Sequence, residues 1–143
     1  MGHYLNPGTG LFEMSLRSEI YIDKSRLIEQ TNRYIKTQQR YLCVSRPRRF
    51  GKSMALDMLA AYYDRMEDTQ NIFDKLEICQ SQSYDQHLNQ YDVLRINMQE
   101  FLSASSNVDE MLKLLQARLI KELKERYTAV SYTHLTLPTI RLV

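Results

Sequence analysis

The chain has 143 residues, of which 43% are hydrophobic and 25% are charged, and these fractions are ordinary for one globular domain with a buried core. Nineteen basic residues against seventeen acidic ones give a formal charge of +2, which is too small to indicate a nucleic-acid-binding protein by itself. The sequence shows no charged-then-apolar leader and no apolar run of membrane-spanning length, so we expect a cytoplasmic protein without membrane contact.

The cysteines and histidines do not have the spacing of a metal site. The two cysteines are Cys43 and Cys79, and the three histidines are scattered along the chain. Cys43 falls in a short apolar run, so we expect it to be a small buried core residue. We therefore expect no zinc site and no disulfide framework, and a reducing compartment fits this usage.

The first 40 residues are expected to contain a turn-rich lead-in, a short extended piece at residues 18–22 and a helix. Asn6-Pro-Gly-Thr-Gly10 is typical of turns. Residues 24–39 show helical spacing, with Asp23 as the expected N-cap. The apolar side of this helix would carry Leu27, Ile28, Thr31, Tyr34 and Ile35. The alternative function of the segment is to pack near the base or the phosphates of a nucleotide.

The next segment organises the rest of the chain. Residues 41–44 are a short apolar run typical of a buried strand. Residues 45–50 cannot continue that strand, because Pro47 lacks a donor and three arginines cannot all be buried. Gly51-Lys52-Ser53 then opens a helix over residues 54–63. Strand, loop, Gly-Lys-Ser and helix is the order that a phosphate-binding loop requires.

The residue types of this loop suit a polyphosphate. A helix start presents free backbone N–H groups and the positive end of the helix dipole. Gly51 allows close backbone approach, Lys52 supplies a mobile charge, and the Ser53 hydroxyl can bind a magnesium ion that bridges the phosphates. The usual pattern has glycine five residues before Gly51, where this chain has Arg46. Arginine would be strained there if φ were positive, so the loop is expected to take a different first turn at Pro47.

Two motifs resemble one bacterial family. Arg46-Pro-Arg-Arg-Phe-Gly-Lys-Ser53 resembles the arginine-rich loop of the predicted AAA-ATPase-like family, and Ile20-Tyr-Ile-Asp-Lys-Ser25 resembles its upstream motif. The resemblance covers residues 4–127 and implies ATP binding at Gly51, Lys52 and Ser53. Members of the family often carry a C-terminal PD-(D/E)XK nuclease-like domain, so nucleic acid is a possible partner of the full-length protein.

The second half of the chain is expected to return to the same sheet. Residues 67–90 indicate short helical turns and loop. In residues 92–98, apolar side chains recur at every second position, which predicts a second strand. Strand, helix and strand form a right-handed crossover between parallel strands. We therefore predict an α/β fold, a P-loop NTPase-type parallel sheet flanked by helices and incomplete in this chain.

The sequence also predicts which side chains two of the helices bury. The helix after Ser53 is expected to bury Leu56, Leu59 or Ala60, Tyr63 and Met66, and to expose Asp57, Asp64 and Arg65. Asn107 and Glu110 form a capping-box pattern before a helix with an apolar stripe of Val108, Leu112, Leu115, Leu119 and Leu123.

The chain is expected to have a non-native end. Residues 1–129 read as the N-terminal part of the ATPase-like domain, whereas residues 130–143 resemble translated adaptor read-through. The alternative for this tail is a real terminal strand. ATP hydrolysis also requires an acidic residue on a neighbouring strand, which in the resembling family lies further downstream. We therefore expect an ATPase only in the full-length protein, and weak nucleotide binding without efficient turnover here.

The predicted site binds an adenine nucleotide with Mg²⁺. Its expected cofactor-binding residues are Arg48, Arg49, Phe50, Gly51, Lys52, Ser53 and Met54, with the metal held by Ser53 through the nucleotide. A second hypothesis is a nucleic-acid-binding module in which Arg46, Arg48, Arg49 and Lys52 contact backbone phosphates. A third is a small-molecule kinase with the same loop, for which residues 101–127 show no arginine-rich lid.

Overall fold

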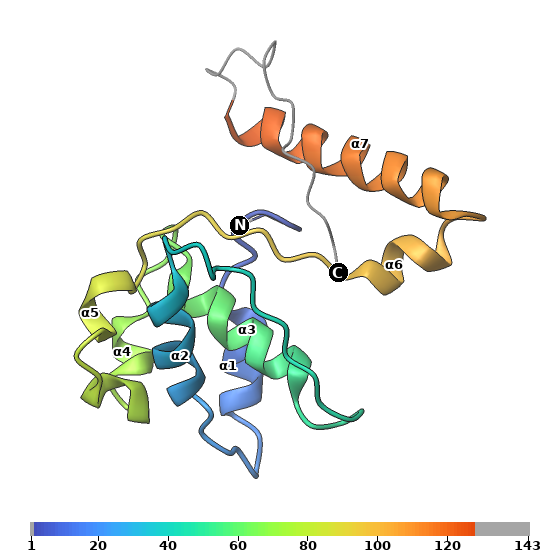
Figure 1. Ribbon diagram of the computed structural model, residues 1–143. Coiled ribbons are helices and arrows are strands. Elements are labelled where there is room, and N and C mark those ends of the chain that lie inside the picture. The colour runs from blue at the N-terminus through green and yellow to red at the C-terminus, as the bar shows by residue number, and fades with distance from the viewer. Residues whose placement is uncertain (1, 128–143) are drawn as a thin grey trace. The chain divides into compact units, whose positions relative to one another are not determined.

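The computed structural model describes residues 2–127, and the chain divides into two units, Met1–Asn97 and Met98–Val143. The first unit contains α1 (Gly10–Leu16), α2 (Arg26–Tyr34), α3 (Lys52–Tyr63), α4 (Gln70–Phe73), the 3-10 helix η1 (Glu77–Gln80) and α5 (Tyr84–His87). The second contains α6 (Met98–Ser103) and the long helix α7 (Val108–Arg126) (Figure 1).

The core of the first unit is aromatic. The Phe12 ring of α1 stacks on Phe73 with the ring centroids 5.4 Å apart, and Tyr62 of α3 meets Phe73 edge to face at the same distance. The Tyr62 hydroxyl donates a hydrogen bond to the backbone oxygen of Tyr84 at 2.6 Å. Such pairs stabilise a core beyond the area that they bury. The buried cluster consists of Phe12, Ile28, Met58, Ala61, Tyr62, Phe73, Ile78, Tyr84 and Leu88.

The predicted parallel sheet is wrong, because the described part of the chain contains helices and no strand. Residues 41–44 are exposed, with Tyr41 at 80% of its full exposure. Residues 92–98 make only the isolated antiparallel bridge of Leu94 to Leu5 before α6 begins. A strand needs a paired neighbour to satisfy its backbone, and the two expected strands do not pair. Cys43 is consequently exposed and not a core residue.

The expected buried face of α3 is confirmed only in part, since Ala60 is buried and Tyr63 packs against the core, but Leu56 and Met66 are exposed. Met58, Ala60, Ala61 and Tyr62 are buried, whereas Leu56 is 55% exposed. Of the polar side chains expected outside, Arg65 is exposed, whereas Asp64 is fully buried and Asp57 forms a close ion pair with Arg95. Residues 54–61 are apolar on nearly every side, so their periodicity could not select the face that packs.

Helix α2 is shorter than expected and starts later. It begins at Arg26 after Ser25 as N-cap, and it ends at Tyr34, because Ile35 turns extended and Lys36 has a φ of 61°. Asp23 is therefore not the cap. Its carboxylate instead accepts hydrogen bonds from the N–H groups of Ser25 and Glu77, both at 2.8 Å. It fastens the segment before α2 to η1.

The expected short turns and the last helix are confirmed. Residues 67–90 form α4, η1 and α5, with Phe73 and Ile78 buried. The Asn107 side chain accepts from the Glu110 N–H at 2.8 Å, while the Glu110 carboxylate accepts from the Ser106 N–H instead of closing the reciprocal bond. Leu115 and Leu119 of the expected stripe are buried with Met111, but Val108 is exposed. Residues 130–143 lie outside the described residues, and the predicted domain bounds stay predictions.

Candidate functional site

The loop before α3 has an alternating backbone conformation. Arg49 has a φ of 65° and Gly51 has a φ of 77°, while Phe50 between them is not among the positive-φ residues of the described chain. Lys52 then adopts the negative φ of a helix. Alternation of this kind turns successive N–H groups toward one side and is typical of anion-binding nests. The strained arginine is thus Arg49, not Arg46, and a non-glycine residue held at positive φ costs about 1–2 kcal/mol.

Lys52 closes the loop on itself. Its Nζ donates a hydrogen bond to the backbone oxygen of Arg46 at 2.5 Å. The bond spans the whole arginine-rich segment, which is exposed along residues 45–50. The charged ammonium of Lys52 therefore joins the two ends of the loop, and its acceptor is a neutral backbone oxygen.

The start of α3 has free donors. The first helical bond is donated by the Ala55 N–H to the Gly51 oxygen at 2.9 Å, so the amides of Lys52, Ser53 and Met54 precede it. These amides and the helix dipole make the first turn positive. Gly51 is the N-cap and has no side chain to satisfy them. The first turn can therefore accept an anion.

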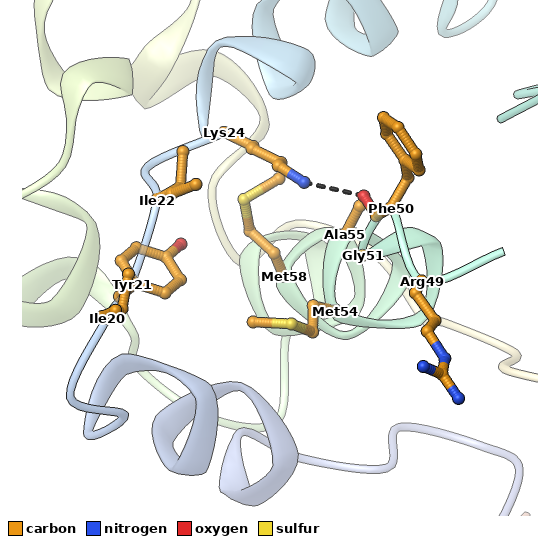
Figure 2. A pocket seen from close by; sticks show the side chains of 10 residues that line it. All are labelled: Ile20, Tyr21, Ile22, Lys24, Arg49, Phe50, Gly51, Met54, Ala55 and Met58. Carbon is orange, nitrogen blue, oxygen red and sulfur yellow. Dashed lines mark hydrogen bonds between the residues drawn. The ribbon is translucent and has the colours of Figure 1, made fainter. Parts of the chain in front are cut away.

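An apolar pocket lies beside this helix start. It has a volume of about 360 Å³, within the range of about 300–1,000 Å³ usual for small-molecule sites. Figure 2 shows Tyr21 and Ile22 on one side and Met54 and Met58 of α3 on the other. Burial, with a smaller effect of the Asp23 charge, raises the pKa of the Tyr21 phenol. The full lining is Ile20, Tyr21, Ile22, Lys24, Arg49, Phe50, Gly51, Met54, Ala55 and Met58.

Lys24 joins the pocket to the loop. Its Nζ donates a hydrogen bond to the backbone oxygen of Phe50 at 2.8 Å (Figure 2). The neighbouring Asp23 holds this segment in place through its bonds to Ser25 and Glu77. Partial burial alone would raise the pKa of Asp23, but these hydrogen bonds outweigh it and lower the pKa. A carboxylate that remains ionised is a firm anchor for the chain next to Lys24.

The acidic residue nearest in sequence to the helix start is already paired. Asp57 lies one turn after Ser53, with its side chain 11% exposed and an oxygen 2.6 Å from Arg95. Desolvation raises the pKa of Asp57, and the opposite charge of Arg95 offsets only part of this shift. Asp57 therefore anchors the segment around Arg95 to α3.

The comparison with family models gives one match. The model described as Predicted AAA-ATPase matches residues 9–140. The chain belongs to the predicted AAA-ATPase family. No curated protein and no solved structure matches the chain.

In this predicted AAA-ATPase, four of the sequence-predicted residues meet at one place. Arg49, Phe50, Gly51 and Met54 line the apolar pocket. Arg48 and Ser53 lie on the same loop and helix turn but do not line it, and Lys52 turns to the Arg46 oxygen. All of them except Gly51 are exposed. Four of the sequence-predicted residues thus line a common pocket, which the sequence did not predict.

The residue that sequence reasoning did not include is Lys24. It lies 26 positions before Phe50, and no periodicity links the two. The only signal was the stretch at residues 20–25, which includes Lys24 and resembles a motif of the family. Ile20 and Ile22 belong to the expected short extended piece at residues 18–22, and their exposed side chains line the pocket.

Two further findings concern membranes and metals. No helix of residues 2–127 combines the length and the apolar character needed to cross a bilayer. The same residues hold no group of three or more histidine, cysteine, aspartate or glutamate side chains suited to a metal ion.

Proposed function

We propose that this predicted AAA-ATPase binds ATP at the start of α3. The triphosphate lies against the amides of Gly51, Lys52, Ser53 and Met54. The observation that carries the proposal is the sign alternation of φ at Arg49 and Gly51 immediately before a twelve-residue helix with unsatisfied N–H groups. Nest and helix dipole both favour a multiply charged anion.

The apolar pocket supplies the second half of the site. A nucleotide combines a charged chain with a flat, mostly apolar ring, and the pocket shares Gly51 and Met54 with the helix start. Its walls are aliphatic, thioether and aromatic, with the rings of Tyr21 and Phe50 among the side chains that Figure 2 shows. Methionine and aromatic side chains adapt well to ring ligands. We assign the base to this pocket.

The residues present fit Mg²⁺ only together with a nucleotide. Ser53 brings a hydroxyl at the second position of α3. Magnesium is usually bound through one or two protein oxygens plus phosphates and water. The ion would neutralise phosphate charge, and Ser53 would hold it.

The proposal is tested by titrating ATP and Mg²⁺ into the parent protein, Lys52→Met and the control Lys75→Met, with calorimetric detection. Lys75 is an exposed lysine in the same unit, outside the loop. Loss of a charge-assisted contact of about 1.5–3 kcal/mol predicts a ten- to hundredfold weaker affinity for Lys52→Met. Equal affinities of Lys52→Met and Lys75→Met refute the assignment.

A second candidate is supported by the exposure of Arg46, Arg48 and Arg49. None of the three forms an ion pair within residues 2–127, so all are free to contact nucleic-acid phosphates. Binding of this kind falls steeply with salt and is not displaced by ATP at low concentration. A single-stranded oligonucleotide displaced stoichiometrically by ATP would argue against this candidate.

A further inference from the structure

Two ammonium groups from separate segments of the chain are bonded to the loop at residues 46–50. Lys52 Nζ donates to the Arg46 oxygen at 2.5 Å, and Lys24 Nζ donates to the Phe50 oxygen at 2.8 Å. Both side chains are exposed, and neither forms an ion pair within the described residues 2–127. Two positive charges are therefore bonded to a loop that already carries three arginines.

This arrangement is a weak resting state for both lysines. A backbone carbonyl is a neutral acceptor, and an ammonium gains more from an ionised acceptor such as a phosphate oxygen. Exposure to water weakens the bonds to the carbonyls further. A polyphosphate at the loop would offer both groups a stronger partner within reach of flexible side chains.

Gly51 provides the space that Lys24 occupies. A Cβ on Gly51 would lie 2.9 Å from Lys24 Nζ, which is closer than real Cβ contacts allow. The ammonium therefore stands directly against the N-cap of α3, where the amides of the first turn begin. Figure 2 shows Lys24 extending across the helix start toward Phe50.

We propose that Lys24 is the second ammonium of the phosphate site and leaves the Phe50 oxygen to contact the terminal phosphates of the nucleotide. The proposal rests on the proposed ATP function. The inference adds a phosphate-binding residue from the segment at residues 20–25. It also gives a reason why Lys24, which lines the pocket, is bonded to the phosphate loop. A merely structural Lys24 would hold the loop without contacting phosphate.

The test compares Lys24→Met, Lys24→Gln and Lys24→Arg with the parent and with Lys75→Met. Each protein is titrated with ATP, ADP, AMP and adenosine, and thermal unfolding confirms that each is folded. Glutamine keeps a donor for the Phe50 oxygen but loses the charge, whereas arginine keeps the charge. We expect Lys24→Met and Lys24→Gln to lose about tenfold in ATP affinity, with smaller losses for AMP and none for adenosine. Lys24→Arg should retain most of the affinity.

Each other outcome overturns the proposal in a recognisable way. Equal ATP affinity of the parent and Lys24→Gln shows that the charge makes no phosphate contact. Equal losses for ATP and adenosine show that Lys24 acts only through the pocket or the fold. If Lys24→Met does not fold, Lys24→Gln and Lys24→Arg decide. A parent that binds none of the nucleotides refutes the proposed function and this inference together, whereas binding that depends on Lys52 but not on Lys24 refutes this inference alone.

Discussion

The Lys24 ammonium lies close against Gly51: its Nζ is 2.9 Å from the position that a Cβ on Gly51 would take. Gly51 also has a φ of 77°, which a residue with a side chain rarely adopts. The positive φ is the reason that glycine is required at the N-cap of α3. A side chain at this position would also displace the Lys24 ammonium, which lies at the end of a flexible side chain from a segment 27 positions earlier.

Gly51→Ala should destabilise the first unit by about 1–2 kcal/mol because of the positive φ, and it should displace the Lys24 ammonium. ATP affinity should fall with it. Gly10→Ala is the matched control, since nothing lies within 4 Å of a Cβ there and alanine is the better helix former. Urea unfolding of the two variants measures the difference. A Gly51→Ala protein as stable as Gly10→Ala would contradict the backbone conformation described for the loop.

Tyr62→Phe should lower the free energy of unfolding by about 1–2 kcal/mol. The change removes the hydroxyl that donates to the Tyr84 oxygen in a fully buried position, so a buried acceptor loses its donor. Tyr41→Phe serves as the control, because Tyr41 is exposed and should change stability by less than about 0.5 kcal/mol. Urea titrations give both values. Similar effects at the two positions would place Tyr62 outside the core.

Asp23→Asn should destabilise the protein by about 1 kcal/mol at neutral pH, with a pH dependence of definite sign. The pKa of Asp23 lies below its ordinary value of 3.8 in the folded protein. Its ionised form therefore stabilises the fold above that pH, and the contribution is lost as the pH falls through the folded pKa. The difference between parent and variant, measured by urea unfolding, should be constant from pH 7 to pH 5 and narrow below 3.8. A difference that widens in acid would contradict the two hydrogen bonds to the carboxylate.

Ser53→Ala should reduce the gain in ATP affinity that Mg²⁺ provides by about three- to tenfold and leave binding in EDTA unchanged. The reason is that the hydroxyl is assigned to the metal and not to the nucleotide itself. Calorimetry with and without Mg²⁺ separates the two contributions. Loss of affinity in EDTA as well would show that Ser53 contacts the phosphate directly.

The helices were more predictable from sequence than the strands. Asn107 and Glu110 marked the start of α7, and Gly51-Lys52-Ser53 marked the start of α3, because caps and helix starts are local features. A strand is not local. The apolar run at residues 41–44 had the composition of a buried strand, but burial depends on a neighbour that the described chain does not place beside it.

The candidate site was predictable as a segment but not as an arrangement. Residue types from Arg48 to Met54 indicated an anion site through elementary properties of glycine, lysine and helix ends. The pocket and Lys24 depend on how residues 20–24 pack beside α3, which is a tertiary relationship. The prediction of which side of α3 is buried was only partly right for a related reason. Nearly all side chains of this helix are apolar, so tertiary packing and not periodicity decides which of them are buried.

The most direct test of the account is a titration of the ¹⁵N-labelled protein with ATP and Mg²⁺, followed through the backbone amide resonances. We predict saturable shifts centred on the amides of residues 49–54, with smaller ones at residues 20–24 that line the pocket. Shifts confined to other parts of the chain, such as the polar groove beside Arg26 and Glu77, or no saturable shift at the start of α3, would contradict the assignment of the phosphate site.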